Sequence, residues 1–345
     1  MYSITKQFIN DLEVSIISVK RDLIQFSCMN YGATILDIIV PDKNGIMENV
    51  VMKYHDLNSY DHDEMYLNAI IGPTSGRIKD AEFTLGKTNY SLDKNFIHTH
   101  NIHGGEESFA FQLFEYQVEE LDEETNIIFT FFKDANYSRY PGDQNIKITY
   151  KITDTALEID FFGTTNQDTL LNMTNHAYFN LSGNMKKSIL DHVLYVNASR
   201  YLSLDSEFIP TDLVSTKNTF LDFLTPTLIK DNMTAEVRKL PTKGIDHPFI
   251  LDDSDYTVVQ AKLTDEQSKR SLSVYTTYPS IVIYTHNFPD GLKLEHNMPQ
   301  VSQMGICFET QFEPNGIHVP NAHQAILLKD QVYHQKTLYQ FSVEE

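Results

Sequence analysis

The stretch NIKITYKITDTALEIDFF, residues 145–162, indicates the fold, because its apolar side chains recur at every second position. Successive side chains of a β-strand point to opposite faces, so this alternation predicts two half-buried strands over 145–152 and 155–162. Thr153 and Asp154, which stand between them, are typical of a turn. We therefore expect an antiparallel hairpin with one face on the core and the other in water.

Short runs of the same kind recur along the chain, separated by Asp, Asn, Gly or Pro. They are NIIFTFF (126–132), HVLYVNAS (192–199), YTVVQAKL (256–263), RSLSVYTTY (270–278), SIVIYTHNF (280–288) and LYQFSVEE (338–345). Candidate helices are confined to 56–66 and 234–240, and neither sustains an apolar stripe over a dozen residues. Many strands at short spacing predict an all-β sandwich or barrel. We find no linker-like stretch or repeat, and therefore expect residues 1–345 to form a single domain.

Composition narrows the classes of function. The formal net charge is −20, and so acidic a chain is repelled by phosphate backbones and anionic lipid, which argues against nucleic acid or a membrane as partner. The longest apolar run, ATILDIIV, is interrupted by Asp37 and is too short to span a bilayer. The N-terminus lacks the basic and apolar segments of a secretory signal. Two cysteines, Cys28 and Cys307, are too few for a disulfide framework, and this favours a reduced, cytoplasmic protein.

Three histidines lie close together in NFIHTHNIHGGEESF, residues 95–109. His98 and His100 would share one face of a strand, and together with Glu106 they are similar to the metal site of a cupin. The gap from His100 to Glu106 is longer than the usual cupin spacing and no second cupin-like block follows, so we expect both histidines in a solvated loop. His103 differs, because the two glycines that follow it would let a ligand approach the backbone closely.

Four other segments carry polar residues that local context alone does not assign. In LNMTNHAYFNLSG, His176 lies among apolar residues, where a hydrogen-bonded core histidine is the commoner case. In KGIDHPFIL, Asp246 either caps a turn before a proline or binds a ligand. In GICFETQFEPNG, Glu309 interrupts an apolar strand, so it either faces water or has a function. The loop IIGPTSGRIKD delivers Arg77 but lacks the Lys-Ser/Thr ending of a phosphate loop.

Taken together and in this order, these segments resemble the aldose 1-epimerase family, the galactose mutarotases. The likeness covers nearly the whole chain, and the combination is far more specific than any one motif. The motifs are NYGATILDIIVPDKNG (30–45), SGRI (75–78), NIHGG (101–105), YPGD (140–143), TNHAYFNLSG (174–183), GIDHPF (244–249), FETQ (308–311) and LYQF (338–341). The resemblance implies one large antiparallel β-sandwich of the galactose mutarotase type, with few short helices and a sugar in an open cleft.

The resemblance also implies roles for individual residues. Glu309 would be the general base and His176 the general acid, with His103 as a partner near the ring oxygen of the sugar. Asp246 and Arg77 would hold sugar hydroxyls through charge-assisted hydrogen bonds.

The chain departs from the family pattern in several places. Pro73 stands where an arginine is usual, and Gly76 stands where some relatives have asparagine. Tyr278 occupies the place of a sugar-binding glutamine, and we expect it to contact the sugar. Ser108 and Phe114 replace a glycine and a tryptophan, so the pocket shape and sugar preference are left open.

The implied activity is the interconversion of the α and β anomers of a free hexose such as galactose or glucose. Opening the ring takes a proton off the C1 hydroxyl and gives one to the ring oxygen, which requires a base and an acid but no metal and no cofactor. A glutamate whose pKa is raised by burial and a histidine with a pKa of about 6.5 would suffice. The chain has no tryptophan, so an aromatic platform for the sugar would come from Tyr178, Phe179 or Tyr278. Such an enzyme would act as a monomer or homodimer.

The sequence leaves three other functions open. A sugar-binding or sensing module without turnover would explain the departures at Pro73 and Tyr278. A glycoside hydrolase would use Glu309 and Asp246 as a carboxylate pair. A cupin-like metalloprotein would show bound metal on elemental analysis, whereas polarimetry and assays for released reducing ends separate the other candidates.

Overall fold

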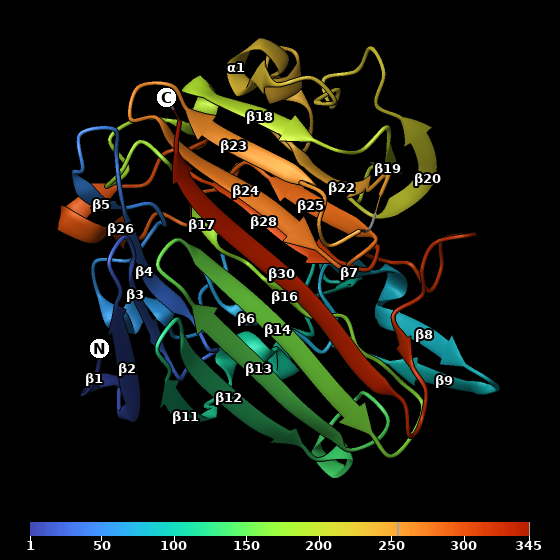
Figure 1. Ribbon diagram of the computed structural model, residues 1–345. Helices are drawn as coiled ribbons and strands as arrows, with labels where there is room; N and C mark the ends of the chain where they lie inside the picture. The colour runs from blue at the N-terminus through green and yellow to red at the C-terminus, as the bar shows by residue number, and fades with distance from the viewer. Residues whose placement is uncertain (254, 345) are drawn as a thin grey trace.

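The computed structural model describes residues 1–253 and 255–344, and its strands pair in antiparallel ladders (Figure 1). The largest sheet has nine strands, in the order β11 Glu115–Glu120, β12 Thr125–Lys133, β13 Gln144–Ile152, β14 Ala156–Thr165, β30 Val332–Val343, β24 Arg270–Thr276, β23 Ala261–Asp265, β18 His192–Val196 and β21 Thr227–Leu228. A second sheet has six strands: β17 Tyr178–Phe179, β28 Ile306–Gln311, β25 Ser280–Tyr284, β22 Asp246–Ile250, β19 Arg200–Leu204 and β20 Pro210–Ser215. The third has five, β1 Tyr2–Ile9, β2 Leu12–Lys20, β3 Gln25–Met29, β4 Ile35–Pro41 and β5 Met47–Asn49.

Short two-stranded ladders connect and flank these sheets. They pair β6 Ile70–Ile71 with β16 Thr174–Asn175, β7 Arg77–Ile78 with β10 Asn101–Ile102, β8 Glu82–Leu85 with β9 Thr88–Ser91, β15 Thr169–Leu170 with β29 Ile326–Leu327, and β26 Lys293–Leu294 with β27 Met298–Pro299. Within the described residues the α-helix is the single turn α1, Ile229–Asn232. Each predicted helical segment contains one 3-10 turn, Leu57–Tyr60 and Val237–Lys239, so the expectation of few and short helices is confirmed.

The predicted hairpin is present as β13 and β14, with Ile152 opposite Leu157 and Ile146 opposite Gly163. Along β13 the even-numbered residues 146–152 are buried, while the residues between them are exposed or half-buried. The hairpin therefore has the expected dry and wet faces. The other predicted strands are present with shifted bounds. The largest shifts are in β23, which begins only at Ala261, in β25, which already ends at Tyr284, and in β30, which extends back to Val332. Glu345, the last residue of the predicted final strand, lies outside the described residues.

The main apolar core lies between the sheets and makes the arrangement a sandwich. It joins side chains of the nine-stranded sheet, such as Ile148 and Phe161, to side chains of the six-stranded sheet, such as Ile283 and Phe308. In Figure 1 the nine-stranded sheet crosses the view diagonally, with β11 at the lower left and β18 at the top. Among the described residues no helix has the length and apolarity to cross a bilayer.

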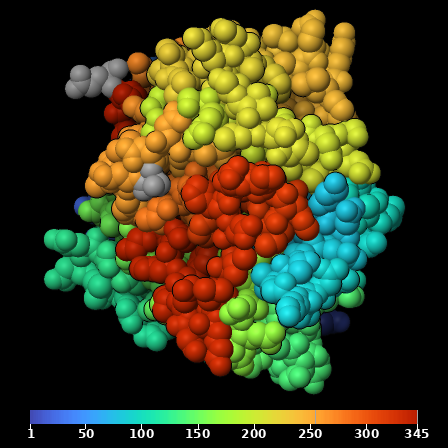
Figure 2. Space-filling model, turned by 90° about the vertical axis from the view of Figure 1, so that its right-hand side faces the viewer, coloured from blue at the N-terminus to red at the C-terminus, as the bar shows by residue number. Residues whose placement is uncertain are grey.

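Figure 2 shows how segments distant in sequence meet on one face of the molecule. The orange-red C-terminal segment lies beside the cyan segment that contains β8 and β9, and the yellow segment with β20 lies above them. One contact between two of these segments is a hydrogen bond of 2.8 Å between the Nε2 atom of His318 and the carbonyl oxygen of Glu82. A second hydrogen bond, from the Lys79 N–H to the side-chain oxygen of Asn315 at 3.0 Å, joins the residues just before β8 to the same C-terminal segment.

Candidate active site

A cavity of about 520 Å³ opens on one face of the six-stranded sheet. Its floor contains Asp246 and Pro248 from β22, Val282 and Tyr284 from β25, and Glu309 from β28. The strand register places Val282 between Glu309 and Pro248. Because alternate residues of a strand share a face, the intervening residues of these strands point into the apolar core. A glutamate in the middle of an apolar strand is thus directed into the cavity and is only 3% exposed.

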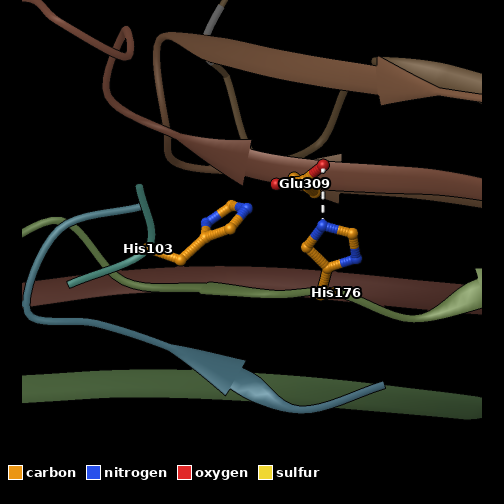
Figure 3. Close-up of side chains that lie close together, drawn as sticks. All are labelled: His103, His176 and Glu309. Atoms are coloured by element: carbon orange, nitrogen blue, oxygen red, sulfur yellow. Dashed lines mark ion pairs between the residues drawn. The ribbon is translucent and has the colours of Figure 1, made fainter. Parts of the chain in front are cut away.

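Three of the predicted site residues converge in this cavity from separate segments (Figure 3). Glu309 extends from β28, His176 lies between β16 and β17, and His103 follows β10. The His176 Nε2 atom lies 3.5 Å from the Glu309 Oε1 atom. The rings of His103 and His176 are nearly perpendicular, with centroids 5.3 Å apart. In the described part of the chain, these three residues also lie close enough together for their ring nitrogens and carboxylate oxygen to bind a metal ion.

His103 is held by the backbone of Gly76. The Gly76 N–H donates to His103 Nδ1 at 3.2 Å, and the His103 N–H donates to the Gly76 carbonyl at 3.0 Å. A neutral imidazole that accepts at Nδ1 carries its hydrogen on Nε2, so His103 presents a donor there. Burial, followed by repulsion from His176 when that ring is protonated and from Arg77, lowers the pKa of His103 well below its ordinary value. His103 is therefore a neutral hydrogen-bond donor at physiological pH.

The glycines around His103 serve packing within the protein. A Cβ atom on Gly104 would lie 2.6 Å from the carbonyl oxygen of Gly72, so a side chain has no room there. Gly76 has a φ of +71°, and a Cβ atom there would lie 2.5 Å from the ring of Pro314. The expectation that the glycines after His103 admit a ligand is replaced by this steric reason.

Arg77 and Asp246 form the charged end of the cavity. The Arg77 guanidinium donates to the Asp246 carboxylate at 2.9 Å, and both side chains are largely buried. Phe96 lies under the guanidinium, 4.7 Å from its central carbon, and Phe208 lies 5.8 Å away. A planar cation stacked on a ring and paired with a carboxylate has few free rotamers, which fixes the donors that face the cavity.

Burial shifts the pKa values of the acid-base candidates in opposite directions. Loss of water, reinforced by the charge of Asp246, raises the pKa of Glu309 from 4.5 to about 8, although Arg77 and Gln311 act in the other direction. Burial lowers the pKa of His176 from 6.5 to about 4. The upward direction for Glu309 was expected, but a histidine titrating near its ordinary pKa was not found. Although their separation fits an ion pair, both partners are therefore uncharged at pH 7, with the proton on Glu309.

Other residues that the sequence singled out lie elsewhere. Tyr278 is fully buried in the core, where its hydroxyl lies 2.6 Å from both the Met173 carbonyl and the Tyr333 hydroxyl. It does not line the cavity, so we do not retain it as a sugar contact. Tyr178 lines the cavity, whereas Phe179, on the opposite face of β17, packs into the core. This alternation follows from the two-residue period of the strand.

The histidines of the first motif also separate. His98 is exposed as expected, but His100 is buried, and the expectation of a solvated loop is wrong for it. The His100 Nδ1 atom accepts from the Asp80 N–H at 2.9 Å, and its Nε2 atom lies 3.4 Å from a carboxylate oxygen of Glu207. His100 therefore joins two surface segments next to the cavity instead of forming a cupin-like metal site with Glu106.

Sequence patterns missed several residues of the cavity wall. These include Tyr66, Phe96, Tyr284, Phe288 and Asp290. Tyr284 had a usable signal, because it alternates with Val282 in an apolar run, but only the register with β28 shows that this face is the cavity floor. The others lie in loops whose positions follow from long-range packing.

The chain is similar to known proteins over nearly its whole length. The family model for aldose 1-epimerase matches residues 15–340. Galactose mutarotase of Mus musculus is 30% identical, over 99% of this chain and 100% of its own length. Aldose 1-epimerase of Escherichia coli (strain K12) is 29% identical, over 92% of this chain and 91% of its own length.

Solved structures show the same fold. An aldose epimerase homologue from C. elegans superposes with a TM-score of 0.88 at 23% identity, covering 96% of this chain and 100% of its own. Galactose 1-epimerase from Lactobacillus acidophilus gives a TM-score of 0.85 at 24% identity, covering 100% of this chain and 99% of its own. Together with the full-length sequence match, these similarities show that the chain belongs to the aldose 1-epimerase family.

Proposed function

We propose that this protein interconverts the α and β anomers of a free hexose such as galactose or glucose. The observation that carries the proposal is the shared cavity of Glu309 and His176, with 3.5 Å between the carboxylate oxygen and Nε2. A base and an acid on one cavity wall are what ring opening requires. The relatives named galactose mutarotase and aldose 1-epimerase support the same reaction.

In this mechanism the Glu309 carboxylate takes the proton of the C1 hydroxyl while the His176 imidazolium gives its Nε2 proton to the ring oxygen. The bond between C1 and the ring oxygen breaks, and C1 becomes an aldehyde. Rotation about C1–C2 followed by the reverse proton transfers closes the ring with the other anomer. No net proton is gained or lost.

The pKa values of Glu309 and His176 indicate which step of the reaction is costly. Burial keeps the mobile proton on Glu309 and His176 neutral in the free protein, which is also the protonation state after ring opening. Moving this proton to His176 costs up to about 5 kcal/mol, from about four pK units. A turnover of about 10³ per second corresponds to a barrier of about 13 kcal/mol, so this cost fits within fast catalysis. We infer that the costly step precedes ring opening, when the proton passes from Glu309 to His176.

The remaining residues of the cavity would hold the sugar. His103 presents a neutral Nε2–H donor to the ring-oxygen side, and the Arg77–Asp246 pair offers a charged donor and acceptor to hydroxyls. Hydrogen bonds to such charged groups are about twice as strong as neutral ones. Tyr178 supplies an aromatic wall.

Polarimetry of freshly dissolved α-galactose tests the proposal directly. The protein should speed the approach to equilibrium rotation, and Glu309→Gln should reduce this acceleration by about 10²- to 10⁴-fold. Absence of acceleration with every common aldose would refute the proposal. Sugar affinity in calorimetry without acceleration would instead support a non-catalytic sugar-binding module.

A further inference from the structure

The strand that supplies Glu309 also supplies a second contact to His176. Residues 307, 309 and 311 alternate along β28 and share the cavity-side face. The Cys307 Sγ atom lies 3.6 Å from His176 Nδ1, and the Glu309 Oε1 atom lies 3.5 Å from His176 Nε2. The imidazole is thus held at both nitrogens by two side chains of one strand.

Cys307 is placed to act on His176 and not on a ligand. Its thiol is free and fully buried, and it does not line the cavity. Its sulfur lies within hydrogen-bonding distance of His176 Nδ1, and a backbone hydrogen bond within His176 itself also favours the protonated ring. Burial raises the pKa of Cys307 well above its ordinary value, so the group is a neutral thiol that can accept or donate a weak hydrogen bond.

The role of His176 as a general acid determines which of its two ring nitrogens should keep its hydrogen. A neutral imidazole carries one hydrogen, on either Nδ1 or Nε2. For His176 to exchange a proton with the sugar through Nε2, the hydrogen that stays in place has to be on Nδ1. A hydrogen on Nδ1 needs an acceptor when it is buried, and Cys307 Sγ is at that position.

We propose that Cys307 is a positioning residue that accepts a hydrogen bond from Nδ1–H of His176 and thereby keeps Nε2 as the atom that takes and gives the mobile proton. The inference rests on the proposed function and adds the group that selects the histidine tautomer. In the free protein the Glu309 O–H then points to the Nε2 lone pair. Transfer breaks this O–H bond, forms the Nε2–H bond, and leaves a carboxylate beside an imidazolium held by neutral sulfur.

The neutral character of the sulfur also matters. A carboxylate at this position would stabilise the imidazolium and favour the charged pair. A thiol holds the ring without adding charge, which leaves the mobile proton free to return to Glu309. Two residues of β28 therefore have complementary roles: Cys307 fixes the tautomer of His176, and Glu309 exchanges the mobile proton with it.

The test combines a spectrum with kinetics. We would record ¹⁵N shifts of the histidine rings in the wild-type protein, in Cys307→Ala and in Cys307→Ser, assigning His176 by its loss in His176→Asn. Cys28→Ala is the matched control, because Cys28 is also a free, fully buried thiol but lies in β3. The same proteins would be compared by polarimetry for kcat and KM.

In the wild-type protein we expect His176 to be protonated at Nδ1. Cys307→Ala should give a mixture of tautomers and lower kcat about three- to tenfold with little change in KM, the effect of one hydrogen bond. Cys307→Ser, whose hydroxyl also accepts, should keep the Nδ1–H tautomer and most of kcat, and Cys28→Ala should change neither. A wild-type ring protonated at Nε2, or a Cys307→Ala protein with unchanged tautomer and kcat, would overturn the inference. The nitrogen spectrum decides this even if the wild-type protein shows no mutarotation, which would refute the proposed function separately.

Discussion

Replacing Glu309 by glutamine should stabilise the folded protein, and the gain should grow with pH. The pKa of Glu309 is about 8 in the folded protein and 4.5 as its ordinary value. Between these two values the folded chain holds a proton that the unfolded chain has released, so the stability of the wild-type protein falls as pH rises through this window. Glutamine resembles the protonated acid in shape but does not titrate, and it removes this loss.

The size of the effect follows from the pKa difference. A shift of about 3.5 units corresponds to about 5 kcal/mol once the carboxylate is fully ionised in both states. By linkage, the stability difference between the variant and the wild-type protein should grow by about 3 kcal/mol between about pH 5 and about pH 8. Groups that do not interact with Glu309 titrate alike in both proteins and cancel in this difference.

Urea denaturation of both proteins across this pH range measures the difference. Glu158→Gln is a control of opposite sign: burial acts to raise the pKa of Glu158, but hydrogen bonds from Lys151 and Tyr256 outweigh it and lower the pKa below its ordinary value. Glu158→Gln should therefore lose stability relative to the wild-type protein as pH rises from acid. If the gain of Glu309→Gln does not change with pH, the argument that the folded protein retains the Glu309 proton is wrong.

Three further results are expected. The pair of Glu309 and His176 holds one proton between about pH 4 and about pH 8, so kcat/KM should be constant over this pH range. At lower pH kcat/KM should fall because no base is left, and at higher pH it should fall because no acid is left. A single decline centred near pH 6.5 would contradict this expectation. Asp246→Asn keeps the shape but removes the charge beside Arg77, and it should raise KM about tenfold or more with a smaller effect on kcat, as measured by polarimetry over a range of sugar concentrations. Tyr278→Phe should leave KM unchanged, because the residue lies outside the cavity. It should lower the free energy of unfolding by about 1–2 kcal/mol through loss of its buried hydrogen bonds. A raised KM would indicate that Tyr278 contacts the sugar after all.

The alternation of apolar and polar residues predicted the strands well where one face of a strand is buried and the other is exposed to water. The hairpin of β13 and β14 has its expected buried and exposed faces, because the alternation of apolar and polar residues within each strand is a local property of the sequence. The run 256–263 was less informative, since its first half is a turn and the strand starts at Ala261. Hydrophobicity alone does not distinguish a strand from an apolar turn packed against the core.

Local sequence patterns also predicted only part of the candidate active site. A charge in the middle of an apolar strand marked Glu309, and resemblance to the family brought it together with His176 and Arg77. Tyr278 and His100 were misplaced because their surroundings come from segments remote in sequence, such as Tyr333 and Glu207. Neither contact leaves a trace in local spacing.

The sequence by itself determined the period of the strands, the acidic surface and the residue types available for acid-base chemistry, because these depend on the chain's own covalent order. The tertiary structure decided which faces of β22, β25 and β28 meet in a cavity, and it decided the protonation of Glu309 and His176. Removal of water depends on every atom packed around a group, and those atoms come from segments more than a hundred residues apart.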